Sequence, residues 1–194
     1  MLENNIVDFR EIAREVLDEN PLFLDTETTG LYGDAEVVEI AIANAQGNIL
    51  FESLVRPSHP IPPDATAVHG ITDDMVQDAP TWADIHGIVD FLLGGRTVAI
   101  YNADFDVRML RQTAALYDKT IPDFQPFCVM KHYARRFSVW NDYFGDYKWV
   151  KLIYAAENLG VTTPAGRPHR AAYDCLLTVG ILRSMAGITD INNR

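Results

Sequence analysis

Three short motifs, far apart in the chain, carry acidic side chains that only a suitable fold could bring into one site. They are Asp25-Thr26-Glu27-Thr28-Thr29-Gly30, Asn102-Ala103-Asp104-Phe105-Asp106 and His169-Arg170-Ala171-Ala172-Tyr173-Asp174. Asp25 and Glu27 follow an apolar run, and because side chains in a strand alternate between faces, we expect these two carboxylates to point the same way. Adjacent carboxylates repel unless positive charge lies between them, and hard oxygen ligands favour Mg²⁺ or Mn²⁺ over Zn²⁺. If the motifs converge, they predict a metal site.

The second motif joins an expected strand to an expected helix. Residues 97–101 are apolar enough for a buried strand, and the pattern from Asp104 to about Tyr117 is helical. Asp106 then falls in the first turn of the helix, where the helix dipole supports a carboxylate.

The third motif lies at the start of a final helix predicted by apolar periodicity. This periodicity runs through Leu177, Ile181 and Met185. His169 and Asp174 are five positions apart, about one and a half turns, so they can flank one site without sharing a helix face. This spacing suits a base beside a metal ligand.

The remaining pattern predicts an α/β fold with a mixed sheet flanked by helices. Three segments should form an antiparallel meander: a strand near Leu22, Glu36–Ala43 and Asn48–Val55. Gln46-Gly47 supplies one of its turns. A helix from about Thr81 to Leu93 leads through Gly94-Gly95 into the next strand, and this helical crossover favours parallel pairing with the first strand.

Composition predicts one soluble domain over residues 1–194, with residues 1–20 forming an N-terminal helical extension. The chain has 194 residues, 48% of them apolar, and no Gly/Ser-rich stretch divides it. Cys128 and Cys175 lack the spacing of a disulfide framework, and we find neither a signal peptide nor an apolar stretch of membrane length. We therefore expect a reduced, cytoplasmic protein with no membrane partner.

Taken in order, the motifs resemble those of the DnaQ-like 3′→5′ exonucleases with the Asp-Glu-Asp-Asp-His (DEDDh) signature. Two further segments appear in the order of that family: Glu39-Ile40-Ala41 and His69-Gly70-Ile71-Thr72. Three motifs in order, each in a fitting strand or helix context, are a strong signal, whereas a lone Asp-x-Glu is a weak one. Segments around residues 129–136 and 169–175 look most like the exonuclease X branch, whereas residues 137–151 look less like it.

The resemblance implies a ribonuclease H-like fold and hydrolysis of the 3′-terminal phosphodiester with two Mg²⁺ ions, which Mn²⁺ could replace. By analogy Asp25 bridges both ions, Glu27 and Asp174 hold the ion that carries the attacking water, and Asp106 holds the second ion partly through water. His169 deprotonates that water. Mononucleotides should leave the 3′ end of DNA, with single strands preferred.

Five substrate contacts are implied by the same resemblance: Thr28, Leu31, His69, Asn102 and Phe105. Structural roles stay open for each of them. Thr28 could cap a turn ending at Gly30, and His69 could be a turn residue after the Pro-rich stretch 57–63. The other three could be ordinary core or surface residues.

A net charge of −11 argues against a polyanionic substrate, but the charge is unevenly distributed. Residues 1–127 carry 7 basic and 22 acidic groups, residues 128–170 carry 7 and 3, and residues 171–194 carry 2 of each. The basic residues of the middle stretch are Lys131, Arg135, Arg136, Lys148, Lys151, Arg167 and Arg170. Interleaved with aromatics, they could track a single-stranded backbone, although a solvated face over core aromatics is the alternative.

Two other functions stay open from sequence. The same chemistry could trim RNA or short oligoribonucleotides, because it needs no 2′-hydroxyl group. The chain could also be a binding or proofreading module attached to a polymerase. Protein partners are not predicted.

Overall fold

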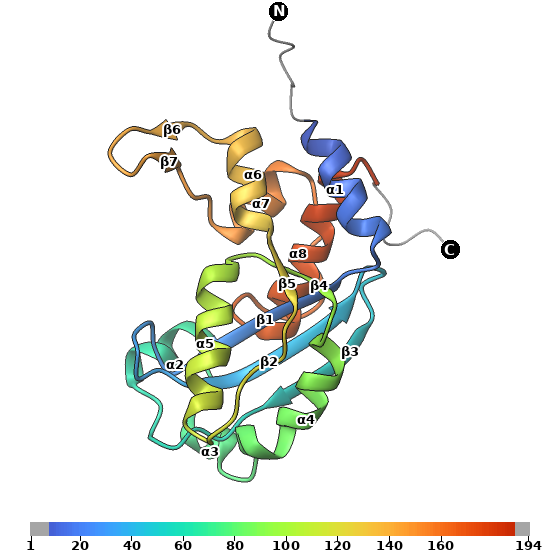
Figure 1. The fold of residues 1–194 in the computed structure, drawn as a ribbon. Coiled ribbons are helices and arrows are strands. Elements are labelled where there is room, and N and C mark those ends of the chain that lie inside the picture. Colours follow the sequence, from blue (N-terminus) through green and yellow to red (C-terminus); the bar gives the residue numbers. More distant parts are fainter. Residues whose placement is uncertain (1–7, 189–194) are drawn as a thin grey trace, which may run out of the picture.

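A mixed five-stranded sheet forms the centre of the computed structural model, which describes residues 8–188 (Figure 1). Its strands are β1 (Leu22–Thr28), β2 (Val37–Asn44), β3 (Ile49–Leu54), β4 (Thr97–Ile100) and β5 (Gln125–Cys128). The spatial order is β3-β2-β1-β4-β5. Strands β1 to β3 form an antiparallel meander, and β4 pairs in parallel with both β1 and β5. The predicted meander and the parallel β1–β4 pairing are confirmed.

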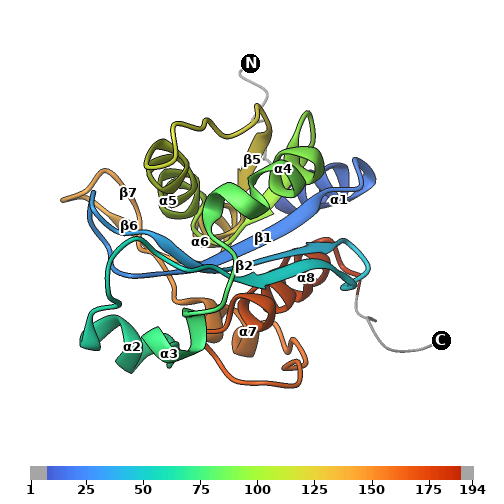
Figure 2. The ribbon, with the colours of Figure 1, turned by 90° about the horizontal axis from the view of Figure 1, so that it is seen from below.

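Helices cover both faces of this sheet (Figure 2). They are α1 (Phe9–Asp18), α2 (Pro63–His69), α3 (Asp73–Val76), α4 (Trp82–Leu93), α5 (Ala103–Ala115), α6 (Val129–Phe137), α7 (Leu152–Asn158) and α8 (Ala171–Met185). Helices α4 and α5 pack on one face, and α8 lies across the other with α7 beside it. The predicted architecture, a mixed sheet flanked by helices, is confirmed.

The side chains of β1 alternate between the two faces of the sheet and contribute to a separate core layer on each face. Leu22 and Leu24 belong to the cluster beneath α4 and α5, whereas Phe23 belongs to the cluster beneath α8. Continuing this alternation places Asp25 and Glu27 on the α8 face. The two acids of the first motif therefore face the helix that carries the third motif.

Several elements were not predicted from sequence. Helices α2 and α3 follow the Pro-rich stretch, β5 is four residues long and contains a proline, and β6 (Trp140–Asn141) and β7 (Asp146–Tyr147) are two-residue strands of a hairpin. Such short segments carry little periodicity. Within the predicted extension, α1 packs against α8, whereas residues 1–7 lie outside the described residues.

Candidate active site

The second half of β1 has an open edge, and Asp106 occupies it. The last residue pair between β1 and β4 joins Phe23 to Ala99, beyond which the strands separate. Asp106, in the first turn of α5 as predicted, fills this gap. Its Oδ1 accepts a hydrogen bond of 3.2 Å from the backbone N–H of Thr26 and one of 2.7 Å from the Thr26 hydroxyl. The residue between the two β1 acids thus fixes the third acid.

The other members of the cluster come from the N-terminal end of α8. Possible ligand atoms of Glu27, His169 and Asp174 all lie within 4.8 Å of one another. Nδ1 of His169 is 4.0 Å from Oδ2 of Asp174. The motifs that sequence analysis singled out therefore converge at one end of β1.

His169 differs in position from the prediction. Helix α8 begins at Ala171 with Arg170 as its extended N-cap, so His169 precedes the helix and the helical-spacing argument does not apply. Its φ of 59° lies in the left-handed region, which few residues other than glycine adopt. Its side chain is 59% exposed, so a substrate in solution can reach the ring.

The four acids have raised pKa values because they are buried or largely shielded from solvent and lie close together. Burial, followed by the neighbouring carboxylates, raises the pKa of Asp25 well above its ordinary range and that of Glu27 to about 8. Burial raises the pKa of Asp106 to about 7, although the hydrogen bonds from Thr26 lower it. Burial likewise raises the pKa of Asp174 to about 6, partly offset by nearby His169.

This cluster fits a divalent cation. Within residues 8–188, the hydrogen bonds and ion pairs give none of the four acids a lysine or arginine partner. Four carboxylates with no lysine or arginine bound to them are the donor set that Mg²⁺ and Mn²⁺ favour, and a bound ion would supply further positive charge.

One further acid beside this cluster is compensated by the protein itself. Glu39 lies opposite Glu27 in the β1–β2 pairing and is only 1% exposed. Both of its oxygens accept from Nε of Arg170 at 3.0 Å, Nη2 of Arg170 also donates to it, and the Ala171 N–H donates at 2.8 Å. Glu39 thereby caps α8 and holds the residue next to His169.

This contact was not predicted from sequence, which grouped Arg170 with the basic residues that could track a nucleic-acid backbone. That grouping is wrong, because the guanidinium of Arg170 turns inward to Glu39. The partners are 131 positions apart, so local spacing could not pair them. An acid in the apolar strand segment Glu39-Ile40-Ala41 was the available signal, since a buried acid requires a partner.

The predicted contact His69 is buried, and both of its ring nitrogens face backbone groups. Nδ1 accepts from the N–H of Ile71 at 3.0 Å, so Nε2 carries the proton and donates to the carbonyl of Thr28 at 3.2 Å. Burial lowers the pKa of His69, consistent with this neutral form. The hydroxyl of Thr28 donates to the carbonyl of Gly30 at 2.7 Å. His69 and Thr28 support the end of β1, and their contact with a nucleotide stays a prediction.

Leu31 projects into solvent from the loop after β1. Its side chain is 64% exposed, and the adjacent Tyr32, which was not predicted, is 78% exposed. Arg108 braces the loop: its Nη2 donates to the Leu31 carbonyl at 3.1 Å, and its guanidinium lies 5.4 Å from the centre of the Phe105 ring. Phe105 and Asn102 are partly buried at the start of α5. The loop therefore holds two nonpolar side chains beside the predicted contacts on α5.

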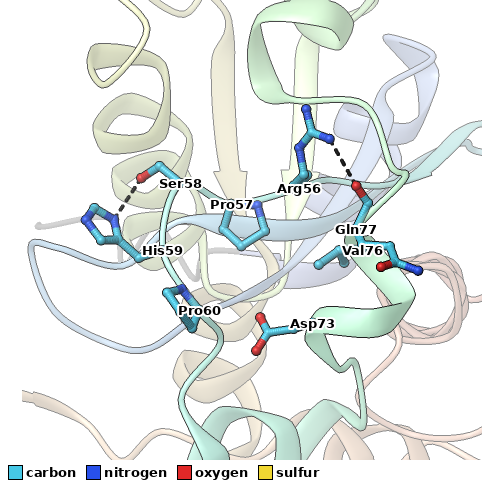
Figure 3. A pocket seen from close by; sticks show the side chains of 8 residues that line it. All are labelled: Arg56, Pro57, Ser58, His59, Pro60, Asp73, Val76 and Gln77. Carbon is cyan, nitrogen blue, oxygen red and sulfur yellow. Dashed lines mark hydrogen bonds between the residues drawn. The ribbon is translucent and has the colours of Figure 1, made fainter.

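Figure 3 shows a surface pocket between the segment that follows β3 and helix α3. It is lined by Arg56, Pro57, Ser58, His59, Pro60, Asp73, Val76 and Gln77. Its polar groups hold the local loops together: Nη1 of Arg56 donates to the Gln77 carbonyl at 3.0 Å, and Oδ1 of Asp73 accepts from the Ile61 N–H at 2.9 Å. The predicted site residues do not line this pocket.

The family model described as "Exonuclease" (RNase T) matches residues 22–182. The chain belongs to the DnaQ-like exonuclease family. It is 46% identical over 180 residues to uncharacterised exonuclease CP81 of Escherichia phage 186, covering 90% of this chain and 92% of that protein. It is 37% identical over 164 residues to exodeoxyribonuclease 10 of Escherichia coli K12, covering 82% of this chain and 65% of that protein.

Solved structures place this DnaQ-like exonuclease in the ribonuclease H-like fold. Exonuclease X in complex with 5′ overhanging duplex DNA matches with a TM-score of 0.61 and 34% identity, covering 87% of this chain and 99% of that one. A 3′-exonuclease that recognises a histone mRNA stem-loop matches with a TM-score of 0.68 but only 20% identity, which supports the fold alone. The predicted family resemblance and fold are confirmed. Among residues 8–188, none of the helices is both long and apolar enough to cross a membrane.

Proposed function

We propose that this exonuclease removes mononucleotides from the 3′ end of DNA by metal-dependent phosphodiester hydrolysis, and that one domain with α1 as its extension suffices for the reaction. The observation that carries the proposal is the convergence of Glu27, His169 and Asp174 within 4.8 Å, beside Asp25 and Asp106. Enzymes of this family and fold normally use divalent metal ions, and the donor set described above suits two of them.

The positions of the residues support the roles proposed for them. Two Mg²⁺ or Mn²⁺ ions would be held by Asp25, Glu27, Asp106 and Asp174. The ions would lower the pKa of a bound water molecule and stabilise the negative charge on the scissile phosphate. His169 would accept the proton of the attacking water. Its exposure and its place outside α8 let the ring approach a reacting group, whereas the four acids are fixed by strand, helix and hydrogen bonds.

DNA is favoured over RNA as the substrate by two relatives. A protein named exodeoxyribonuclease 10 is 37% identical, and the exonuclease X structure, at 34% identity, contains DNA. The RNA alternative stays open because hydrolysis at a two-ion site does not use the 2′-hydroxyl group.

Degradation of matched DNA and RNA oligonucleotides labelled at the 5′ end tests this proposal. With Mg²⁺, single-stranded DNA should yield a ladder that shortens from the 3′ end, faster than RNA of the same sequence, and Asp174→Asn should yield no ladder. Early release of the labelled 5′ nucleotide, or digestion of a circular single strand, would contradict the proposed direction. Turnover by the isolated protein would count against a purely accessory role at a polymerase.

A further inference from the structure

A protruding arm between α6 and α7, residues 138–151, has no role in the site described above (Figure 1). Its two strands are joined by the rings of Trp140 and Tyr147, whose centres are 5.3 Å apart at 87°. At the turn, the Asn141 carbonyl accepts from the Gly145 N–H at 2.9 Å, and Gly145 adopts a left-handed φ of 64°. The arm is therefore a hydrogen-bonded hairpin with a defined tip.

The tip presents aromatic rings to solvent. Tyr143 and Phe144 are 88% and 76% exposed, with ring centres 4.8 Å apart, and Trp149 near the base is 64% exposed. Large exposed nonpolar groups that cluster mark interaction surfaces more often than chance. Because a hydrogen-bonded turn already holds these rings in place, they lose little conformational freedom when another planar ring stacks on them.

The base of the arm rests on the segment that carries a catalytic acid. The hydroxyl of Tyr101 donates to the carbonyl of Val150 at 2.7 Å, and Tyr101 lies five positions before Asp106. Lys131 pairs with Asp104 at 2.5 Å and so ties α6 to the first turn of α5. Figures 1 and 2 both show the arm projecting from the side of the molecule on which β1 ends. A nucleic-acid strand whose 3′ end lies at the acid cluster could therefore run alongside the arm.

Positive charge beside the arm favours a polyanionic occupant. The chain carries a net charge of −11, yet residues 128–170 hold 7 basic and 3 acidic groups. Three of these cations are engaged internally, because Lys131 binds Asp104 and Arg167 and Arg170 bind groups within the fold. The exposed remainder consists of Arg135 and Arg136 at the end of α6 and Lys148 and Lys151 on the arm. The arm also carries Asp142 and Asp146, so the excess of positive charge comes from α6, directly before the arm.

We propose that the arm is a stacking platform for unpaired bases of the substrate strand, several nucleotides from the 3′ end. This inference rests on the proposed function, because it takes the acids as the place where the 3′ end is cut. Aromatic stacking is tolerant of base identity and needs bases that are not paired. The arm therefore favours single-stranded DNA that is long enough to reach it, whatever the base sequence.

The test compares Tyr143→Ala/Phe144→Ala with Phe91→Ala, which removes an equally exposed ring, 77% accessible, from α4. On single-stranded DNA of about 20 nucleotides, loss of one or two stacked bases at about 1–3 kcal/mol each should raise KM about tenfold or more, with kcat within about twofold. The effect should fall away on a dinucleotide, which cannot reach the arm. Phe91→Ala should match the parent on both substrates.

Abasic sites supply an independent readout. A single missing base at the position that meets the arm should raise KM for the parent, and the same lesion should add little in the double variant, because the two changes remove one interaction. Equal KM values for parent and variant on the long strand overturn the inference, and so does an equal rise on the dinucleotide. If KM is unchanged but the variant loses self-association in size-exclusion chromatography, the arm is an interface between copies. Failure of the parent to shorten either substrate overturns the proposed function, and with it this inference.

Discussion

Glu27 and Glu39 face each other on neighbouring strands and are both buried, but only Glu39 is bound directly by a cationic side chain. Glu39 receives the guanidinium of Arg170 and a backbone N–H. Glu27 has three other carboxylates around it, and its pKa is raised to about 8. A buried acid whose charge is neutralised by an arginine stabilises the fold. A buried acid that lies among other acids suits the role of a metal ligand. The same chemical change at these two positions should therefore have different consequences.

The largest expected effect is on turnover in Glu27→Gln. The amide keeps the shape but loses the charge of a proposed ligand, so turnover should fall by several orders of magnitude. Stability without metal should be unchanged at neutral pH, where a pKa of about 8 keeps Glu27 mostly protonated, and higher at more alkaline pH, where the variant lacks the repelled charge. Single-turnover assays and thermal denaturation in EDTA measure the two quantities. Near-parental turnover would show that Glu27 does not hold an essential ion.

His169→Gln should lie next in size, with a loss of about 10²- to 10⁴-fold in kcat, the usual contribution of a general base. Glutamine can orient a water molecule but cannot take up its proton. Metal affinity, measured by calorimetry with Mn²⁺, should stay close to that of the parent. A large loss of metal affinity would make His169 a ligand and not a base.

Glu39→Gln should chiefly lower stability, because it leaves the largely buried guanidinium of Arg170 without a charged partner. Breaking such a pair costs about 3–5 kcal/mol in full burial, and we expect about 2 kcal/mol here because the Arg170 side chain is 33% exposed. Turnover should fall only about tenfold, through displacement of His169. Glu157→Gln, at a solvent-exposed acid on α7, is the control and should be neutral. A stable variant whose activity matches that of Glu27→Gln would remove the distinction between the two acids.

The smallest effect concerns pH and metal together. Carboxylates with raised pKa values hold protons in the folded state that the unfolded chain has lost, so their stabilising contribution is complete below about pH 4 and is lost as pH rises towards about 8. In EDTA, the melting temperature should fall by a few degrees between about pH 6 and about pH 8.5. Addition of Mg²⁺ should raise the melting temperature more at the higher pH than at the lower one. Equal Mg²⁺ effects at both values would speak against an uncompensated cluster.

The sequence predicted those features that depend on local periodicity and motif order. The β1 to β3 meander, the start of α5 and the shared face of Asp25 and Glu27 all follow from side-chain alternation or helix signals. The structure adds what depends on distant partners. Neither the capture of Asp106 by Thr26 nor the inward turn of Arg170 could be read from spacing, because each joins elements that fold together only in three dimensions.

The interrupted edge of β1 has a consequence for how such an enzyme can vary over time. One face of β1 carries Asp25 and Glu27, and the edge holds Asp106 through the backbone N–H of Thr26. Any substitution at Thr26 except proline leaves that N–H in place, but loss of one residue upstream in β1 would turn both acids towards α4 and α5. In related sequences, insertions and deletions should accumulate in the loop 29–36 and the arm 138–151. A related sequence with a one-residue deletion in β1 should lack nuclease activity.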